Sequence, residues 1–190
     1  MKRSAFKILF IHGYTASSQV DFYPALCSQL NTYGIDYVVP NLPGGTHPHV
    51  KEWLHVLHET IKNNTQPLVI VGQSLGTRAA LLYIEKYQPK VEALFLIASF
   101  ANRVENAQRK GGDAYPDFFS HRIDVEKVKN MVKKSYILHS RDDHSIAYEQ
   151  GVEIAKDLNA ELITFTDRDH FSSSKNAPFI FTVLKDKLGF

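Results

Sequence analysis

Short apolar runs, rich in β-branched and aromatic residues, alternate along the chain with longer segments of helical period. Most of these runs are continuously apolar, which is typical of strands covered on both faces, as in a parallel sheet. The alternation predicts βαβ units in a three-layer α/β/α sandwich with a mostly or wholly parallel six-stranded sheet. The predicted strands are Phe6–Ile11, Ile35–Val39, Leu68–Val71, Val91–Ala98, Tyr136–Leu138 and Leu162–Phe165.

Apolar residues three or four positions apart predict the helices between these strands. Their stripes lie within residues 22–30, 50–61, 75–84, 148–158 and 179–184. The third stripe is apolar nearly all round, so we expect that helix to be deeply buried. The pattern is interrupted in residues 101–134, which are polar and leave room for at most one short helix. Connections of this length within a domain are usually functional loops or lids.

Composition narrows the class of protein mainly by exclusion. The 190 residues are 44% apolar and 22% charged, near the averages for one globular domain, and no linker divides residues 1–190. The net charge of +2 is too small to argue for nucleic acid or an anionic membrane surface. One cysteine, Cys27, rules out an intrachain disulfide and fits a reducing compartment. Without a signal peptide or a long apolar span, a cytoplasmic protein that does not insert into membranes is expected.

The sharpest chemical signal is Gly72-Gln73-Ser74-Leu75-Gly76, a G-x-S-x-G motif between a predicted strand and a predicted helix. A strand-to-helix reversal forces the middle residue into a strained conformation, and the flanking glycines remove side chains that would clash. The Ser74 hydroxyl is then exposed at the carboxyl edge of the sheet, beside a helix N-terminus that favours negative charge. We interpret Ser74 as a nucleophile; the alternative is a tight turn without chemistry.

A nucleophilic serine needs a base, and the base needs an acid that orients it, here in the chain order Ser, Asp, His. Asp142 and Asp143 follow the fifth predicted strand, and His170 follows the last one. Both positions lie at the carboxyl edge of the sheet, where open α/β sheets bind ligands. Spacing alone barely separates Asp142 from Asp143, and acidic residues after strands are also common helix caps.

An oxyanion hole is expected where the first strand ends in His12-Gly13-Tyr14. Gly13 permits a sharp turn that can aim a backbone N–H toward the serine. The expected donors are the backbone N–H groups of Tyr14 and of Leu75, directly after the nucleophile. We expect His12 to shape this loop through hydrogen bonds instead of acting as an acid or base.

Four histidines cluster near the second predicted helix, namely His47, His49, His55 and His58. No carboxylate or cysteine except Glu59 completes a recognisable metal-ligand spacing. We therefore expect a solvated helix and its entry loop here, and no metal. The serine chemistry requires no organic cofactor either.

Together these motifs resemble the α/β-hydrolase superfamily and, more narrowly, the small serine hydrolases of the YdeN and retinoblastoma-binding protein nine group. The resemblance covers almost the whole chain and implies a six-stranded core without a large cap. Gln73 departs from the histidine that such relatives usually carry there. The residues that carry the resemblance are His12-Gly13-Tyr14, Asn41-Leu42-Pro43, Trp53, Gly72–Gly76, Asp142-Asp143 before Ile146, and His170-Phe171.

The resemblance favours Asp143 as the acid, because an aliphatic residue follows the acid three positions later in these enzymes, as Ile146 does here. Ile146 would also anchor the start of the next helix and fix the turn. Asp142 is then expected to project outward, beside Arg141. The catalytic residues that we expect are therefore Ser74, Asp143 and His170.

The expected function is a carboxylesterase-like serine hydrolase that cleaves a small ester, thioester or activated amide through an acyl-enzyme. Two alternatives stay open: an acyltransferase with the same triad, and a catalytically silent binding protein on this fold. The expected partner is a small acyl substrate, and no nucleic acid is expected. Aromatic residues available to line an acyl pocket are Phe100, Tyr115, Phe118 and Phe119.

Overall fold

The computed structural model describes residues 4–99 and 115–190. Within these residues, six parallel strands form one open sheet in the order β2-β1-β3-β4-β5-β6. Every predicted strand is present, and the predicted fold class is confirmed. The strands are β1 (Lys7–Ile11), β2 (Asp36–Val38), β3 (Leu68–Gln73), β4 (Val91–Ile97), β5 (Ser135–Ser140) and β6 (Glu161–Phe165).

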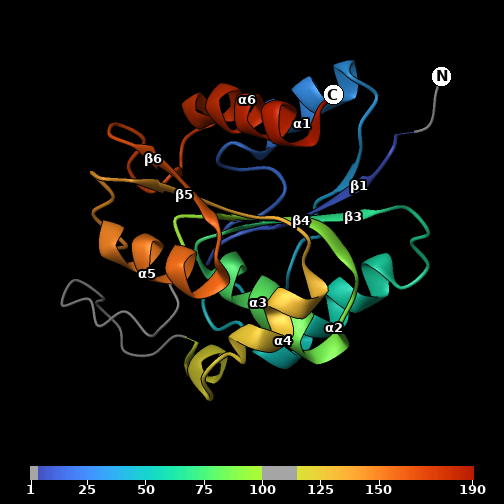
Figure 1. Ribbon diagram of the computed structural model, residues 1–190, viewed down its shortest axis with the longest axis vertical. Coiled ribbons are helices and arrows are strands. Elements are labelled where there is room, and N and C mark those ends of the chain that lie inside the picture. The colour runs from blue at the N-terminus through green and yellow to red at the C-terminus, as the bar shows by residue number, and fades with distance from the viewer. Residues whose placement is uncertain (1–3, 100–114) are drawn as a thin grey trace.

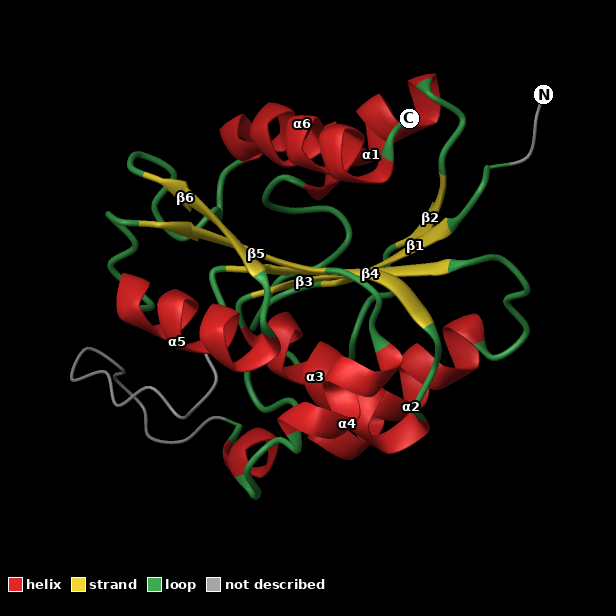
Figure 2. Cartoon of the chain, in the orientation of Figure 1, coloured by secondary structure: helices red, strands yellow, loops and turns green. Residues whose placement is uncertain are grey.

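Helices cover both faces of this sheet (Figure 1). The first and last helices pack against each other on one face, and the other four lie on the opposite face (Figure 2). They are α1 (Tyr23–Thr32), α2 (Val50–Ile61), α3 (Leu75–Tyr87), α4 (Val125–Met131), α5 (Tyr148–Leu158) and α6 (Ala177–Leu188), with short 3₁₀ turns η1 (Pro116–Phe119) and η2 (Ser174–Asn176). None of the described helices is long and apolar enough to cross a membrane.

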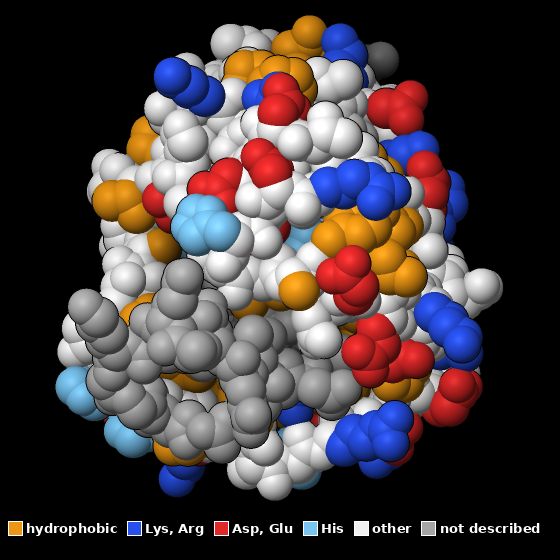
Figure 3. All heavy atoms as spheres, turned by 90° about the vertical axis from the view of Figure 1, so that its left-hand side faces the viewer, with side chains coloured by type: hydrophobic (Ala, Val, Ile, Leu, Met, Phe, Trp, Pro, Cys, Tyr) orange, Lys and Arg blue, Asp and Glu red, His pale blue; other side chains and the backbone are white. Residues whose placement is uncertain are grey.

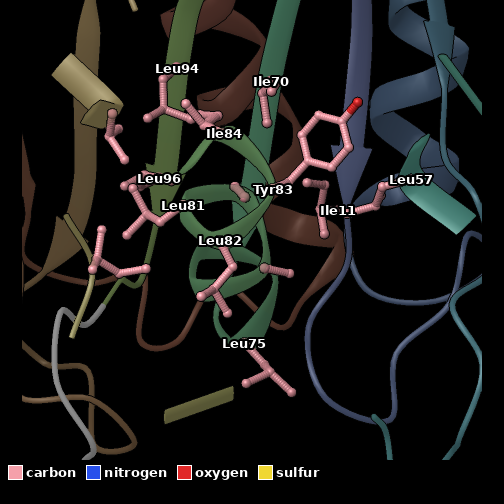
Figure 4. Close-up of a cluster of buried hydrophobic side chains, with 14 of the residues drawn as sticks. Ile11, Leu57, Ile70, Leu75, Leu81, Leu82, Tyr83, Ile84, Leu94 and Leu96 are labelled. Carbon is pink, nitrogen blue, oxygen red and sulfur yellow. The ribbon is translucent and has the colours of Figure 1, made fainter. Parts of the chain in front are cut away.

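The central helix α3 is held on several sides, as its apolar sequence predicts. All residues from Leu75 to Ile84 are buried. Figure 4 shows side chains of this helix clustered with Ile70 of β3 and with Leu94 and Leu96 of β4. Because α3 is fixed against the sheet in this way, the turn at its N-terminus is fixed as well.

Strand β5 is longer than its apolar run predicts. It continues through His139 and Ser140, which are polar but fully buried. The hydrophobic pattern ends at Leu138. A prediction based on apolar residues therefore omits the polar residues that complete a buried strand. Strands β3, β5 and β6 end at one edge of the sheet, and acidic and histidine side chains are exposed on that face of the molecule (Figure 3).

Candidate active site

Ser74 occupies the turn between β3 and α3 with φ of 52° and ψ of −123°. This positive-φ conformation is uncommon for a residue other than glycine. The glycines are needed because the backbone is crowded: a Cβ at Gly72 would lie 2.7 Å from the Gly76 carbonyl oxygen, and a Cβ at Gly76 would overlap with the carbonyl of Ile11. The Ser74 N–H donates to the Ile97 carbonyl at 3.0 Å, which ties the turn to β4. The expected strained elbow is present.

His170 lies on the loop after β6, and its Nε2 is 2.9 Å from Ser74 Oγ. Its neighbours Asp169 and Phe171 both have positive φ, at 47° and 58°. Phe171 is fully buried and packs edge-on against Phe165. Apolar burial on one side of His170 thus helps to hold a backbone conformation that is itself unfavourable.

Asp143 lies on the other side of the His170 ring. Its Oδ2 and Oδ1 are 3.0 Å and 3.1 Å from His170 Nδ1. Oδ1 also accepts the backbone N–H groups of Ser145 at 2.9 Å and Ile146 at 2.8 Å. These two bonds fix the carboxylate at the start of the turn, and Ile146 is buried as the sequence predicts. The structure therefore places Ser74, His170 and Asp143 in one hydrogen-bonded row.

Asp142 is exposed, as expected, but its expected contact with Arg141 is wrong. The Arg141 guanidinium lies over the Tyr148 ring, 4.5 Å from the ring centre. Asp142 Oδ1 instead accepts the Ser140 hydroxyl and, at 3.0 Å, the backbone N–H of Asp169. The hydrogen bond from Ser140 is the main reason that the pKa of the Asp142 carboxyl is lowered. Asp142 thus links the loops that follow β5 and β6.

Two further residues hold the histidine loop, and the sequence interpretation missed both. Ser140 Oγ accepts the Arg168 N–H at 3.0 Å. Gln73 is buried and its Nε2 donates to the His170 carbonyl at 3.3 Å. The signal that could have found them is a polar residue that closes an otherwise apolar strand at the carboxyl edge.

The backbone N–H groups of Leu75 and Tyr14 have no hydrogen-bond acceptor within the part of the chain that the structure describes. Leu75 is the first residue of α3, where N–H groups lack an intrahelical partner. The hydroxyl of Tyr14 donates to the Thr46 carbonyl at 2.9 Å, which ties this side chain to the loop before α2. Both N–H groups that we expect to be oxyanion donors therefore lack a hydrogen-bond partner among the described residues. Leu75 directly follows Ser74, and Gly13, just before Tyr14, lies beside the Ser74 side chain.

His12 shapes the loop that carries Tyr14, as expected. Its Nε2 accepts the Leu42 N–H at 2.9 Å, so the ring proton lies on Nδ1, which donates to the Gly13 carbonyl at 2.9 Å. Trp53 packs edge-on against the ring. Burial lowers the pKa of His12, so the ring is neutral at pH 7.

The four aromatic residues expected to line a pocket lie in different surroundings. Phe100 falls outside the described residues. The Tyr115 ring packs 5.0 Å from the Tyr14 ring, next to the loop that follows β1. Phe118 is fully buried and packs edge-on against Trp53, which makes it part of the core and not the wall of an open pocket.

Phe119, the fourth residue, is half-buried beneath the guanidinium of Arg78. Arg78 lies on α3 and donates to the carbonyls of Phe118 at 2.7 Å and His121 at 2.6 Å. Burial lowers the pKa of Arg78 to about 10, so the group keeps its charge at pH 7. Glu85, about two turns further along the same face of α3, pairs with His121 at 2.7 Å. The helix that begins directly after Ser74 therefore also fixes the segment that contains Phe118 and His121.

The histidines near α2 have other contacts. His58 stacks on Tyr87 with ring centres 4.3 Å apart, and His49 lies 3.5 Å from Asp117. Across residues 4–99 and 115–190, no three His, Cys, Asp or Glu side chains are grouped so that they could hold a metal ion.

We expect the free energy of unfolding to fall as the pH is lowered from about 7.5 to about 5.5. Burial lowers the pKa of His12 and His139 in the folded protein, whereas unfolded histidines titrate near pH 6.5. The unfolded chain therefore binds protons first, and this contribution to stability is present above about pH 6.5 and lost as the pH falls through the folded pKa values. Urea unfolding at both pH values measures the loss. His139→Gln should lose less, and an equal loss would rule out His139 as a contributor.

The fold is that of an α/β-hydrolase. The crystal structure of the ydeN gene product from Bacillus subtilis has the same fold, with a TM-score of 0.86 and 23% identity over 97% of this chain and 100% of that one. Est1E from Butyrivibrio proteoclasticus has it as well, with a TM-score of 0.76 and 17% identity over 98% of this chain and 88% of that one.

Within this class, the chain belongs to the serine hydrolase family, whose family model matches residues 8–177. It is 25% identical over 186 residues to YdeN of Bacillus subtilis (strain 168), covering 94% of each chain. It is 29% identical over 144 residues to the serine hydrolase RBBP9 of Rattus norvegicus, covering 75% of this chain and 73% of that one. The resemblance drawn from the motifs is confirmed.

Proposed function

We propose that this hydrolase cleaves a small ester, thioester or activated amide through an acyl-enzyme. Ser74 is the nucleophile, His170 the base and then the acid, and Asp143 the group that orients His170. The observation that carries the proposal is the continuous row from Ser74 Oγ to His170 Nε2 at 2.9 Å and from His170 Nδ1 to Asp143 at 3.0 Å. Because Asp143 accepts from Nδ1, the Nε2 of neutral His170 is free to accept a proton.

In the acylation step, Ser74 Oγ bonds to the substrate carbonyl carbon while its proton moves to His170 Nε2. The electron pair of the C=O bond moves to the oxygen, and the N–H groups of Leu75 and Tyr14 stabilise that charge. The carbonyl then re-forms as the bond to the leaving group breaks. The leaving group takes the proton from His170, and the acyl group stays on Ser74.

In the deacylation step, water gives its proton to His170 Nε2 and attacks the acyl carbon. The bond to Ser74 Oγ breaks, Ser74 recovers its proton from His170, and the carboxylic acid leaves. An alcohol or amine acceptor could replace water at this step, which is how the same residues would perform acyl transfer.

The acyl-enzyme can be tested by measuring how its acyl group partitions between water and hydroxylamine. Two esters with the same acyl group and different leaving groups are hydrolysed at one fixed hydroxylamine concentration. A shared acyl-Ser74 intermediate requires the same ratio of hydroxamate to acid from both esters. Ratios that differ between the esters would contradict the intermediate. Absence of turnover, with tight binding of a substrate analogue, would favour the silent binding protein.

We also expect a preference for short acyl chains. Residues 99–134 are too few for a large helical cap, and Phe118, one of the aromatic residues there, is buried in the core. Without a cap to cover it, a long acyl chain stays largely in solvent, so additional methylenes gain little binding energy. The measurement is kcat/KM for p-nitrophenyl acetate, butyrate, octanoate and palmitate, which should decline along the series. A marked rise in rate on emulsified long-chain triglyceride would contradict it.

A further inference from the structure

A second histidine lies beside Asp143, and the proposed mechanism does not use it. His139 is near the end of β5, and neither its side chain nor that of Asp143 is exposed. His139 Nε2 is 3.0 Å from the Ile146 carbonyl and 3.5 Å from Asp143 Oδ2. A carbonyl only accepts, so the ring proton lies on Nε2. Burial lowers the pKa of His139, which keeps the ring neutral.

The rest of the His139 ring is tightly enclosed. Its Nδ1 is buried and has no hydrogen-bond partner among the described residues. A Cβ at Gly151 would overlap with Nδ1, so only glycine fits at this position of α5. The Tyr148 ring packs edge-on against the imidazole. The ring is therefore held in one place by its neighbours.

This placement is unfavourable for the fold on two counts. A glycine inside a helix weakens the helix, and a buried nitrogen without a partner is disfavoured relative to an apolar side chain of the same shape. Both features have the same consequence, which is an N–H group held against the Ile146 carbonyl, in the turn that carries Asp143. Such local departures from good packing are expected near functional residues.

The two oxygens of Asp143 are supported unequally. Oδ1 accepts the backbone N–H groups of Ser145 and Ile146. Oδ2 faces His170 Nδ1 at 3.0 Å and His139 Nε2 at 3.5 Å. His139 Nε2–H donates to the Ile146 carbonyl and thereby holds the turn whose backbone N–H groups bind Asp143 Oδ1, while its ring lies beside Oδ2.

We propose that His139 is a positioning residue: its Nε2–H holds the Ile146 carbonyl and so fixes the turn that orients the Asp143 carboxylate, and Gly151 is there to admit its ring. The catalytic consequence of this orientation rests on the proposed function. The orientation itself does not, because it concerns the hydrogen bond between Asp143 and His170 in the free protein.

Two substitutions at His139 separate the N–H from the bulk of the ring. His139→Phe fills the space without a donor, whereas His139→Gln keeps an amide N–H near the place of Nε2. We expect His139→Phe to lower kcat for a short ester by roughly tenfold to a hundredfold at unchanged KM, since a displaced catalytic group costs rate more than binding. His139→Gln should recover most of the loss.

A third variant acts from α5, a helix that carries none of the proposed catalytic residues. Gly151→Ala places a methyl group against His139 Nδ1 and must displace the ring, so it should lower kcat as His139→Phe does, although alanine favours helix. Val152→Ala, at the next and exposed position of α5, is the matched control and should leave kcat unchanged.

The readout that a merely structural role would not move is the proton NMR signal of the His170 Nδ1–H in its bond to Asp143. We expect this downfield signal to broaden or move in His139→Phe and Gly151→Ala, and to persist in His139→Gln and Val152→Ala. An unchanged signal in His139→Phe and Gly151→Ala would overturn the proposal, as would equal loss of kcat in His139→Phe and His139→Gln. If the wild type turns over no ester but the signal changes as expected, the positioning role stands and the proposed hydrolysis fails.

Discussion

Replacing Ser74 with alanine should reduce ester turnover to the buffer background, a loss of about a millionfold in kcat, as expected when the nucleophile of a triad is removed. His170 Nε2, 2.9 Å from Ser74 Oγ, then has no hydroxyl to deprotonate. Alanine meets the same positive φ of 52° that serine already adopts, so the fold should be retained. The measurement is p-nitrophenyl acetate hydrolysis by wild type and variant, with circular dichroism as the check on folding.

A serine that is close in sequence to the base provides the matched control. Ser172 is exposed and lies two residues after His170. Ser172→Ala should keep wild-type turnover. Turnover by Ser74→Ala that remains within tenfold of wild type would show that another group attacks the substrate.

Replacing Asp143 with asparagine should lower kcat by about four orders of magnitude, the loss expected when the base takes the wrong tautomer. The backbone N–H groups of Ser145 and Ile146 both point at Oδ1, so the asparagine oxygen must stay there. The amide NH₂ then takes the place of Oδ2 and faces His170 Nδ1. Two donors cannot face each other, so the His170 proton moves to Nε2, which can no longer accept the Ser74 proton.

Replacing Asp142 with asparagine should cost no more than about tenfold, because the asparagine oxygen can still accept the Asp169 N–H and the Ser140 hydroxyl. The two asparagine variants have the same shape and the same change in charge at adjacent positions. The comparison is kcat of both on one ester under the same conditions. If Asp142→Asn shows the larger loss of kcat, the orienting acid is Asp142 and not Asp143.

The sequence predicts the sheet well because burial on both faces makes the central parts of β1, β3 and β4 continuously apolar. It also predicts the elbow, since strand, glycines, serine and helix are adjacent in the chain. The boundaries of β5 were less predictable. His139 and Ser140 are buried polar residues, and hydrophobic periodicity does not detect such residues.

Partners across the fold were not predictable from local sequence. Asp142 was expected beside its neighbour Arg141, but it binds the backbone of Asp169, on another loop. Phe118 lies in a polar segment and was expected in a pocket, yet it packs in the core against Trp53. Hydrogen bonds between loops that are far apart in the chain determine which residues surround the site. These bonds cannot be predicted from local patterns in one sequence.

The most direct test of the account is to locate the adduct formed by a fluorophosphonate probe, which reacts with activated serines. The protein is labelled, digested and sequenced by mass spectrometry. The account predicts one modified residue, Ser74, and no adduct in Ser74→Ala. An adduct on Ser17, Ser140 or Ser173, or ester turnover by a protein that takes up no probe, would contradict it.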